Sequence, residues 1–277
     1  MDTKKISSLS RPLDTDYPDN RLIVLLCAMI FIASVLFRMI SGDNLLPGII
    51  WSARDALSVF FAWALTKEID PDHPESAIIA AGVGISGLFL FNYPNLLIAL
   101  LLVFLFRMVN RTVGVPLTLY DSILIVITGI YLVYTGKWMY GIVMSIAFFM
   151  DAILTNPVKR HFLFASISLI AGLFGFYMKG IEIDLISGYY IIVLLLLALF
   201  FIFRIVLAGK SHSISDRSGD PLSDKRILVT CIVALIAGLL AVLEGLTSIA
   251  ATFPLWAAIS GATVFDISQK LLKLTRY

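Results

Sequence analysis

The sequence predicts an all-α protein, a polytopic membrane helix bundle of about ten transmembrane helices. Of its 277 residues, 59% are hydrophobic and only 14% are charged, and the mean hydropathy is +0.94. Soluble domains carry about 25% charged residues, so this composition is typical of a chain that sits in lipid. The apolar residues also form separate runs close to the ~20 residues needed to cross a hydrocarbon core about 30 Å thick.

Ten apolar runs define the expected helices in order along the chain. The polar residues 1–21 precede them and are expected to form a cytoplasmic N-terminal segment, followed by one multi-pass transmembrane domain over residues 22–277. The runs are residues 22–40, 48–66, 77–92, 95–109, 118–136, 138–155, 162–178, 188–208, 227–246 and 250–269. Residues 209–226, between the eighth and ninth runs, are expected to form a mixed-charge cytoplasmic loop.

The basic residues predict the orientation of these helices. With the N-terminus in the cytoplasm, 17 of the 21 lysines and arginines fall in cytoplasmic segments, whereas Arg38, Lys137 and Lys179 fall outside and Arg54 falls within the membrane. Cytoplasmic loops carry an excess of Lys and Arg in membrane proteins. We therefore expect an integral protein of the cell membrane with both termini cytoplasmic.

Similar segments recur in the same order along the chain. The stretch from Ser58 resembles that from Ser145, "SGLFLF" resembles "AGLFGF", and "FLFRMV" resembles "FIFRIV". An even number of helices per copy keeps both copies in the same orientation, as in parallel transporter repeats. A 4+4 parallel repeat of helices two to five and six to nine is one interpretation, and chance similarity among Leu-, Ile- and Phe-rich helices is the other.

The second run contains charged residues where lipid should not face them. At 100° per residue, one arc of about 100° holds Trp51, Arg54, Asp55, Ser58, Ala62 and Leu65. Intramembrane charges usually pair or line a wet cavity, so Arg54, Asp55 and Ser58 are candidate intramembrane polar-site residues. Asp151 in the sixth run is the expected partner of Arg54. A buried packing pair without a ligand is the alternative.

An acidic loop follows the second run. "TKEIDPDHPES" carries Glu68, Asp70 and Asp72, and carboxylate oxygens are ligands that Mg²⁺ and Ca²⁺ prefer. The competing interpretation is a solvated acidic turn that ends one helix and starts the next. These three residues are therefore metal-ligand candidates, and Mg²⁺ is expected only if the protein is an enzyme; otherwise no cofactor is expected.

Polar residues near the end of the fourth run form the candidate anion site. The stretch "FRMVNRT" supplies Arg107, Asn110 and Arg111 on the predicted cytoplasmic face. The planar guanidinium group suits bidentate binding of phosphate. The alternative is that these residues only provide the basic charge that sets membrane orientation.

Three functional hypotheses follow from these patterns. The first is transport or binding of a small solute or lipid-like substrate. The second is an intramembrane enzyme acting on a phosphorylated lipid at the cytoplasmic face, with the acidic loop holding metal and Arg107 or Arg111 holding phosphate. The third is a structural partner in a membrane complex. The lipid bilayer is the expected environment, no nucleic-acid partner is expected, and no signature of a known membrane-enzyme class assigns a family or a catalytic residue.

Overall fold

The computed structural model describes residues 7–9, 13–91, 94–180 and 188–274. Within these residues the regular structure is helical, apart from one isolated antiparallel bridge between Ile214 and Pro221. The helices are α1 (Pro18–Ile40), α2 (Leu45–Ile69), α3 (Pro74–Leu90), α4 (Leu96–Asn110), α5 (Leu119–Tyr134), α6 (Met139–Ile153), α7 (His161–Lys179), α8 (Gly188–Val206), α9 (Asp224–Glu244), α10 (Leu246–Ala251) and α11 (Phe253–Leu274). Each expected run corresponds to one long helix, and the short α10 was not expected. The all-α prediction is confirmed.

Local chemistry explains several helix ends. Proline stands in the first turn of α1 and of α3, where its missing N–H leaves no helical hydrogen bond unmade. Thr118 caps α5, because its side chain accepts a hydrogen bond from the backbone N–H of Asp121. Gly180 and Gly245 follow α7 and α9 with positive φ angles of 66° and 108°, which glycine adopts without a Cβ clash.

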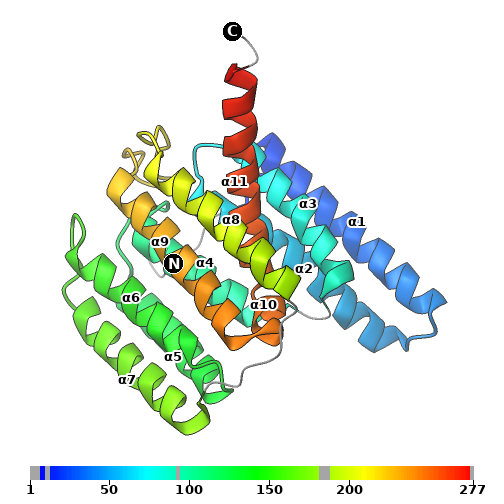
Figure 1. Ribbon diagram of the computed structural model, residues 1–277, viewed down its shortest axis with the longest axis horizontal. Coiled ribbons are helices and arrows are strands. Elements are labelled where there is room, and N and C mark those ends of the chain that lie inside the picture. The colour runs from blue at the N-terminus through cyan, green and yellow to red at the C-terminus, as the bar shows by residue number, and fades with distance from the viewer. Residues whose placement is uncertain (1–6, 10–12, 92–93, 181–187, 275–277) are drawn as a thin grey trace, which may run out of the picture. The chain divides into compact units, whose positions relative to one another are not determined.

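The chain folds into two compact units. Within the described residues, unit 1 covers the chain up to residue 11 and residues 100–249, and unit 2 covers residues 12–99 and 250–277. In unit 1, α6 packs against α5, α7 and α9, and α8 packs against α9 (Figure 1). In unit 2, α2, α3 and α11 pack against one another, and α1 packs against α2 and α3. The boundary between the units lies inside α4, and each unit combines segments that are far apart in the sequence. The units are therefore defined by which helices pack together and not by the order of the helices along the chain.

Glycines allow close helix contacts in both units. A Cβ at Gly141 of α6 would lie 2.5 Å from the Cα of Gly172 in α7, so the two backbones touch directly. In unit 2, a Cβ at Gly261 of α11 would lie 2.5 Å from the backbone oxygen of Ser76 in α3. Small residues at such crossings are typical of helix packing in membranes, where van der Waals contact must replace the hydrophobic effect.

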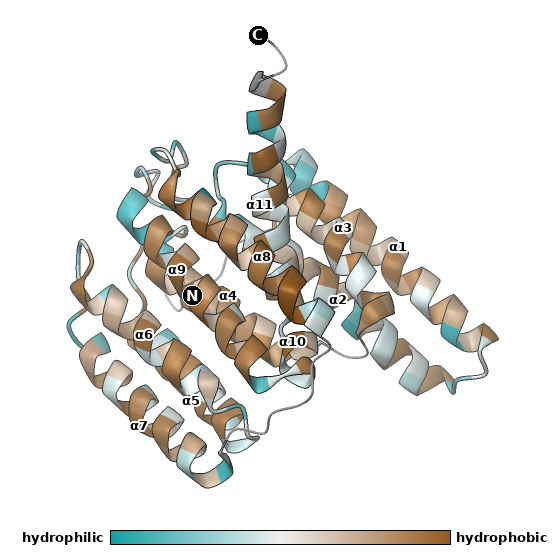
Figure 2. Ribbon diagram, viewed as in Figure 1, coloured by the Kyte–Doolittle hydropathy of each residue, from teal (hydrophilic) through white to brown (hydrophobic). Residues whose placement is uncertain are grey.

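The surface is apolar over long helical stretches. The helices α1, α2, α7, α8 and α9 are long and apolar enough to cross a membrane. In α1 and α8 the most apolar windows have a mean hydropathy of 2.7 but are only 6% and 17% buried, so these apolar side chains face outward. Figure 2 shows hydrophobic residues along α8 and hydrophilic residues gathered in the neighbouring loops. Monomeric soluble proteins rarely expose contiguous apolar surface on this scale.

The helix lengths and the unit boundary bear on the ten predicted membrane spans and on the predicted repeat. The helices α3, α4, α5 and α6 have 17, 15, 16 and 15 residues, about 23 to 26 Å at 1.5 Å per residue. They are apolar but shorter than a straight span, so ten crossings remain a prediction. The boundary between units separates α2 and α3 from α5, which lends no support to the repeat, and the repeat and the single transmembrane domain also remain predictions.

Candidate functional site

One end of unit 1 gathers polar residues from five helices, and we call it the Asp151 end. It is formed where α4 and α6 end and where α5, α7 and α9 begin (Figure 1). The connecting loops bring residues far apart in sequence to one place, because adjacent antiparallel helices return the chain to the same level. The described N-terminal residues 7–9 join this end through hydrogen bonds to α4 and α5.

A buried carboxylate organises the Asp151 end. Asp151, 1% exposed, accepts hydrogen bonds at Oδ1 from Nη1 of Arg226 at 2.8 Å and from Nη2 of Arg111 at 3.0 Å. Its Oδ2 lies 2.8 Å from Nδ1 of His161, which is fully buried. A carboxylate out of water is strongly unfavourable unless opposite charges and hydrogen bonds compensate it. Two guanidinium groups and an imidazole supply that compensation.

The two arginines also connect the loops around them. Arg226 donates to the backbone oxygens of Val109 and Thr155, at 2.7 and 2.6 Å. Arg111 donates to the backbone oxygen of Asn156 at 2.7 Å. The last carbonyl groups of a helix have no helical partner, and Arg226 satisfies such a group at Val109 in the last turn of α4. Thr155 and Asn156 belong to the loop that follows α6. Asp151 and its arginines therefore fix the geometry of three chain segments at once.

A pocket of about 130 Å³ opens beside this cluster. Its lining residues are Asn110, Arg111, Gly114, Thr155, Asn156, Ser215, Ser218, Asp220, Pro221, Leu222, Ser223 and Arg226. Two of them, Arg111 and Asn156, have positive φ angles of 57° and 56°, and no other described non-glycine residue has one. Such conformations cost of order 1–3 kcal/mol for most residues and often occur at functional sites.

Glycine is required at a third position in the pocket. Gly114 has a φ of +90°, and a Cβ there would lie 2.6 Å from Oγ of Ser218 and 2.7 Å from Oγ of Ser215. The backbone N–H groups of Asp216 and Arg217 donate to the carbonyl oxygens of Thr112 and Val113, which holds the loop before α9 against the loop after α4. The loop over residues 209–226 is therefore part of the pocket wall and not only a solvated connection.

The pocket has the chemistry of a small-anion site. Arg111 and Arg226 carry two positive charges against the single charge of Asp151, and Arg111 directs no hydrogen bond from Nη1 to another described residue. The exposed Asp220 also lines the pocket, but water and salt screen exposed charges much more than buried ones. The volume lies below the roughly 300–1,000 Å³ of drug-sized sites, so the pocket suits a ligand of a few atoms.

A serine extends the buried cluster on the side of α5. Oγ of Ser122 lies 3.0 Å from Nε2 of His161, whose Nδ1 faces Asp151, so the three side chains have the connectivity of a Ser–His–Asp triad. All three are at least 99% buried, and neither Ser122 nor His161 lines the pocket. Ser122 is also placed to donate to the backbone oxygen of Thr118. A substrate needs access to the serine oxygen, which this arrangement does not provide.

A second buried carboxylate holds the N-terminal residues. Asp121 accepts hydrogen bonds from the side chains of Ser7, Ser8 and Thr118 and from the backbone N–H of Ser8, all between 2.7 and 2.9 Å. Arg107 donates to the backbone oxygen of Leu9 at 2.8 Å. Of the three predicted anion-binding residues, Asn110 and Arg111 therefore line the pocket, whereas Arg107 binds the N-terminal segment instead.

The predicted polar residues of α2 lie in unit 2. Asp55 accepts a hydrogen bond from Ser34 of α1 at 2.6 Å and forms an ion pair with Arg38 of the same helix at 3.2 Å. Arg54 stacks over Trp51 at 4.4 Å and reaches the backbone oxygen of Pro94 at 3.5 Å. Ser58 is buried.

The expected ion pair between Arg54 and Asp151 stays a prediction, because the two residues lie in different units. Within its own unit, Asp151 has three basic partners, Arg111, His161 and Arg226. In the sequence, Arg226 is the last residue of the expected loop 209–226, directly before the ninth run, but it lies 75 residues from Asp151 and no local pattern connects the two. Ser122 carried no sequence signal beyond its residue type.

The acidic loop forms no metal site in the part of the chain that is described. Glu68 and Asp70 are buried, and Oδ1 of Asp70 is 2.9 Å from Nδ1 of His73. Among the described residues, no group of three or more His, Cys, Asp or Glu side chains is placed to hold a metal ion. The geometry therefore gives no support to metal binding by Glu68, Asp70 and Asp72.

No known protein family, curated protein or solved structure matches this chain.

Proposed function

We propose that this chain is a multi-pass protein of the cell membrane that binds a small anion at the Asp151 end and takes part in its transport. The anion is phosphate-like, either a free solute or the head group of a lipid. The observation that carries the proposal is the arrangement of Arg111, which lines the pocket with a free Nη1 while Asp151 fixes the rest of its guanidinium group.

Preorganisation is the physical reason why this arrangement favours binding. An arginine in solvent loses side-chain freedom when it binds a ligand, whereas Arg111 is already held by Asp151 and by the backbone of Asn156. Fixing a group in its bound geometry before the ligand arrives reduces the entropic penalty of association. Arg226 adds positive charge and loses little side-chain freedom when a ligand binds. Its side chain is only 4% exposed, and both of its terminal nitrogens, Nη1 and Nη2, already donate hydrogen bonds.

The positions of charged residues along unit 1 support a membrane-crossing orientation. Glu244 lies 18 positions after Arg226 in α9, about 27 Å along the helix at 1.5 Å per residue. That distance is close to the hydrocarbon thickness of about 30 Å, and both charged residues stand at helix ends. The Asp151 end then lies at the cytoplasmic face, because the predicted cytoplasmic loops of unit 1 meet there, and both termini are cytoplasmic in this orientation.

The test uses the purified full chain in neutral detergent and in liposomes. We expect inorganic phosphate or a short-chain phosphatidic acid to bind. Arg111→Met should lower the affinity for the tighter-binding probe by about tenfold or more, because a hydrogen bond to a charged group contributes roughly 1.5–3 kcal/mol. Lys159→Met is the matched control, since Lys159 lies on the α6–α7 loop near the same end but does not line the pocket.

The liposome measurement separates transport from binding. Uptake of radiolabelled phosphate that falls in Arg111→Met supports transport of a free solute, whereas binding of phosphatidic acid alone points to a lipid head group. If neither probe binds, or if Arg111→Met and Lys159→Met behave alike, the proposal is wrong.

Hydrolysis of a phosphorylated or acylated lipid is the second candidate, and the Ser122–His161–Asp151 connectivity is the observation in its favour. Its test is labelling by a fluorophosphonate probe, which reacts with activated serines. Label that disappears in Ser122→Ala would support the hydrolase. We expect no label, because Ser122 is fully buried.

A further inference from the structure

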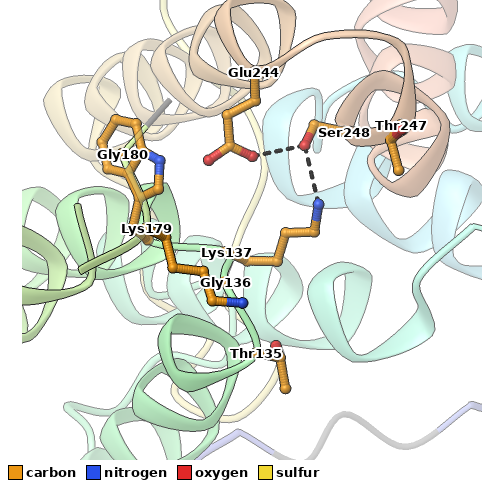
Figure 3. Close-up of a pocket in the computed structure, with 9 residues that line it drawn as sticks. Thr135, Gly136, Lys137, Lys179, Gly180, Glu244, Thr247 and Ser248 are labelled. Atoms are coloured by element: carbon orange, nitrogen blue, oxygen red, sulfur yellow. Dashed lines mark hydrogen bonds between the residues drawn. The ribbon is translucent and has the colours of Figure 1, made fainter. Parts of the chain in front are cut away.

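A second polar pocket lies at the opposite end of unit 1, and we call it the Glu244 pocket. It has a volume of about 200 Å³ and is lined by Thr135, Gly136, Lys137, Trp138, Lys179, Gly180, Glu244, Thr247 and Ser248 (Figure 3). These residues stand where α5, α7 and α9 end and where α6 begins, so each of these four helices has one end at each site.

The Glu244 pocket gathers two unusual lysines. Lys137 and Lys179 are two of the three basic residues that the predicted orientation places on the outer side of the membrane. They lie 42 positions apart in the sequence, yet both line this one pocket. The positive-inside bias makes lysines infrequent in short outer loops. Two such lysines at one pocket therefore indicate a specific role for positive charge there.

The two lysines have different surroundings. Lys137 donates from Nζ to Oγ of Ser248 at 3.3 Å, and Ser248 donates to Oε2 of the buried Glu244 at 2.6 Å, so a hydrogen-bonded chain joins the opposite charges (Figure 3). Lys179 makes no hydrogen bond or ion pair to another described residue. Its Nζ lies over Gly136, where a Cβ would come within 2.7 Å of it.

The charges and walls of the pocket define a ligand class. Two ammonium groups against one carboxylate leave one positive charge among the described lining residues, and it resides on Lys179. Trp138 supplies a rigid apolar wall, since its ring meets that of Phe176 edge to face at 4.9 Å. The volume again lies below that of drug-sized sites. A small monoanion with a carboxylate or phosphate group matches this site in charge and size.

We propose that the Glu244 pocket is a second anion-binding site, which takes a small carboxylate or phosphate compound between Lys179 and Lys137. Anion binding here does not depend on the proposed function, because no residue is shared with the Asp151 end. Its placement on the outer face does rest on the proposed membrane orientation. In that orientation, the two sites face opposite sides of the membrane at the two ends of the same four helices.

Titration calorimetry on the purified full chain in neutral detergent tests the second site. The probes are lactate, inorganic phosphate and short-chain phosphatidic acid, which distinguish a carboxylate solute, a phosphate solute and a lipid source. We expect at least one of them to bind, and Lys179→Met to weaken that binding by about tenfold. Lys179→Arg should retain most of the affinity. Glu244→Gln should increase affinity, because it removes the negative charge from the pocket.

Variants at the two ends separate the two proposals. Arg111→Met should leave the Lys179-dependent binding unchanged, and Lys179→Met should leave the Arg111-dependent binding unchanged. Lys179 is exposed and its replacement removes no hydrogen bond or ion pair to a described residue, so correct folding of the variant is expected. If no probe binds in a Lys179-dependent manner, the second site does not exist, whatever the result at Arg111.

Discussion

Replacing the carboxylate of Asp151 by an amide is the sharpest test of how unit 1 is held together. Asp151→Asn keeps the side-chain shape but removes the charge that faces Arg226, Arg111 and His161. The side chain of Arg226 is only 4% exposed, so its positive charge would stay buried without its main counter-charge. Removing one partner of a buried ion pair typically costs about 3–5 kcal/mol.

We expect the lower part of that range for Asp151→Asn, because the amide oxygen still accepts one hydrogen bond. A loss of about 3 kcal/mol lowers the midpoint of thermal unfolding by roughly 6–12 °C for a domain of 150–250 residues. The assay is circular dichroism of detergent-purified protein during heating. Asp266→Asn is the matched control, since Asp266 pairs with Lys270 one helical turn away and both are substantially exposed. An exposed pair of this kind contributes about 0–1 kcal/mol.

A double variant tests the cause of the destabilisation. Arg226→Met alone leaves Asp151 with one guanidinium fewer, and together with Asp151→Asn it removes both members of the buried pair. The double variant should therefore be more stable than the sum of the single losses predicts, by a coupling of about 0.5–3 kcal/mol. Additive losses, or a loss in Asp151→Asn no larger than in Asp266→Asn, would refute the role assigned to Asp151.

Three further predictions concern packing, the N-terminal segment and orientation. Gly141→Val should sharply reduce the yield of folded protein, since its Cβ would overlap the α7 backbone, whereas Gly82→Ala should be neutral because nothing lies within 4 Å of its Cβ. Asp121→Ala should speed proteolysis within the first ten residues, as seen by mass spectrometry, because it removes the hydrogen-bond acceptor of Ser7 and Ser8. On a cysteine-free background, Thr247→Cys should react with an impermeant maleimide added outside intact cells, and Lys210→Cys only after lysis; the reverse pattern would invert the orientation.

The sequence by itself determined the helices. Runs of apolar residues closed by proline, glycine and polar clusters depend on interactions within a few positions, and such local signals can be read along the chain. The same reasoning identified Arg111, Asn110 and Asp151 as candidate site residues, because polar groups within or beside apolar helices need partners. It also identified Lys137 and Lys179 as basic residues on the predicted outer side, against the positive-inside bias. It did not show that both line one pocket.

Only the tertiary structure decided which partners those polar groups have. Asp151 pairs with Arg111, 40 residues away, and with Arg226, 75 residues away, because α4, α6 and α9 bring their ends together. No local pattern encodes which helices become neighbours, since that choice depends on glycine contacts and apolar packing across the whole unit. For the same reason the pair of Arg54 with Asp151 stays a prediction: a charge in an apolar helix indicates that a partner exists, and only the fold determines which residue that partner is.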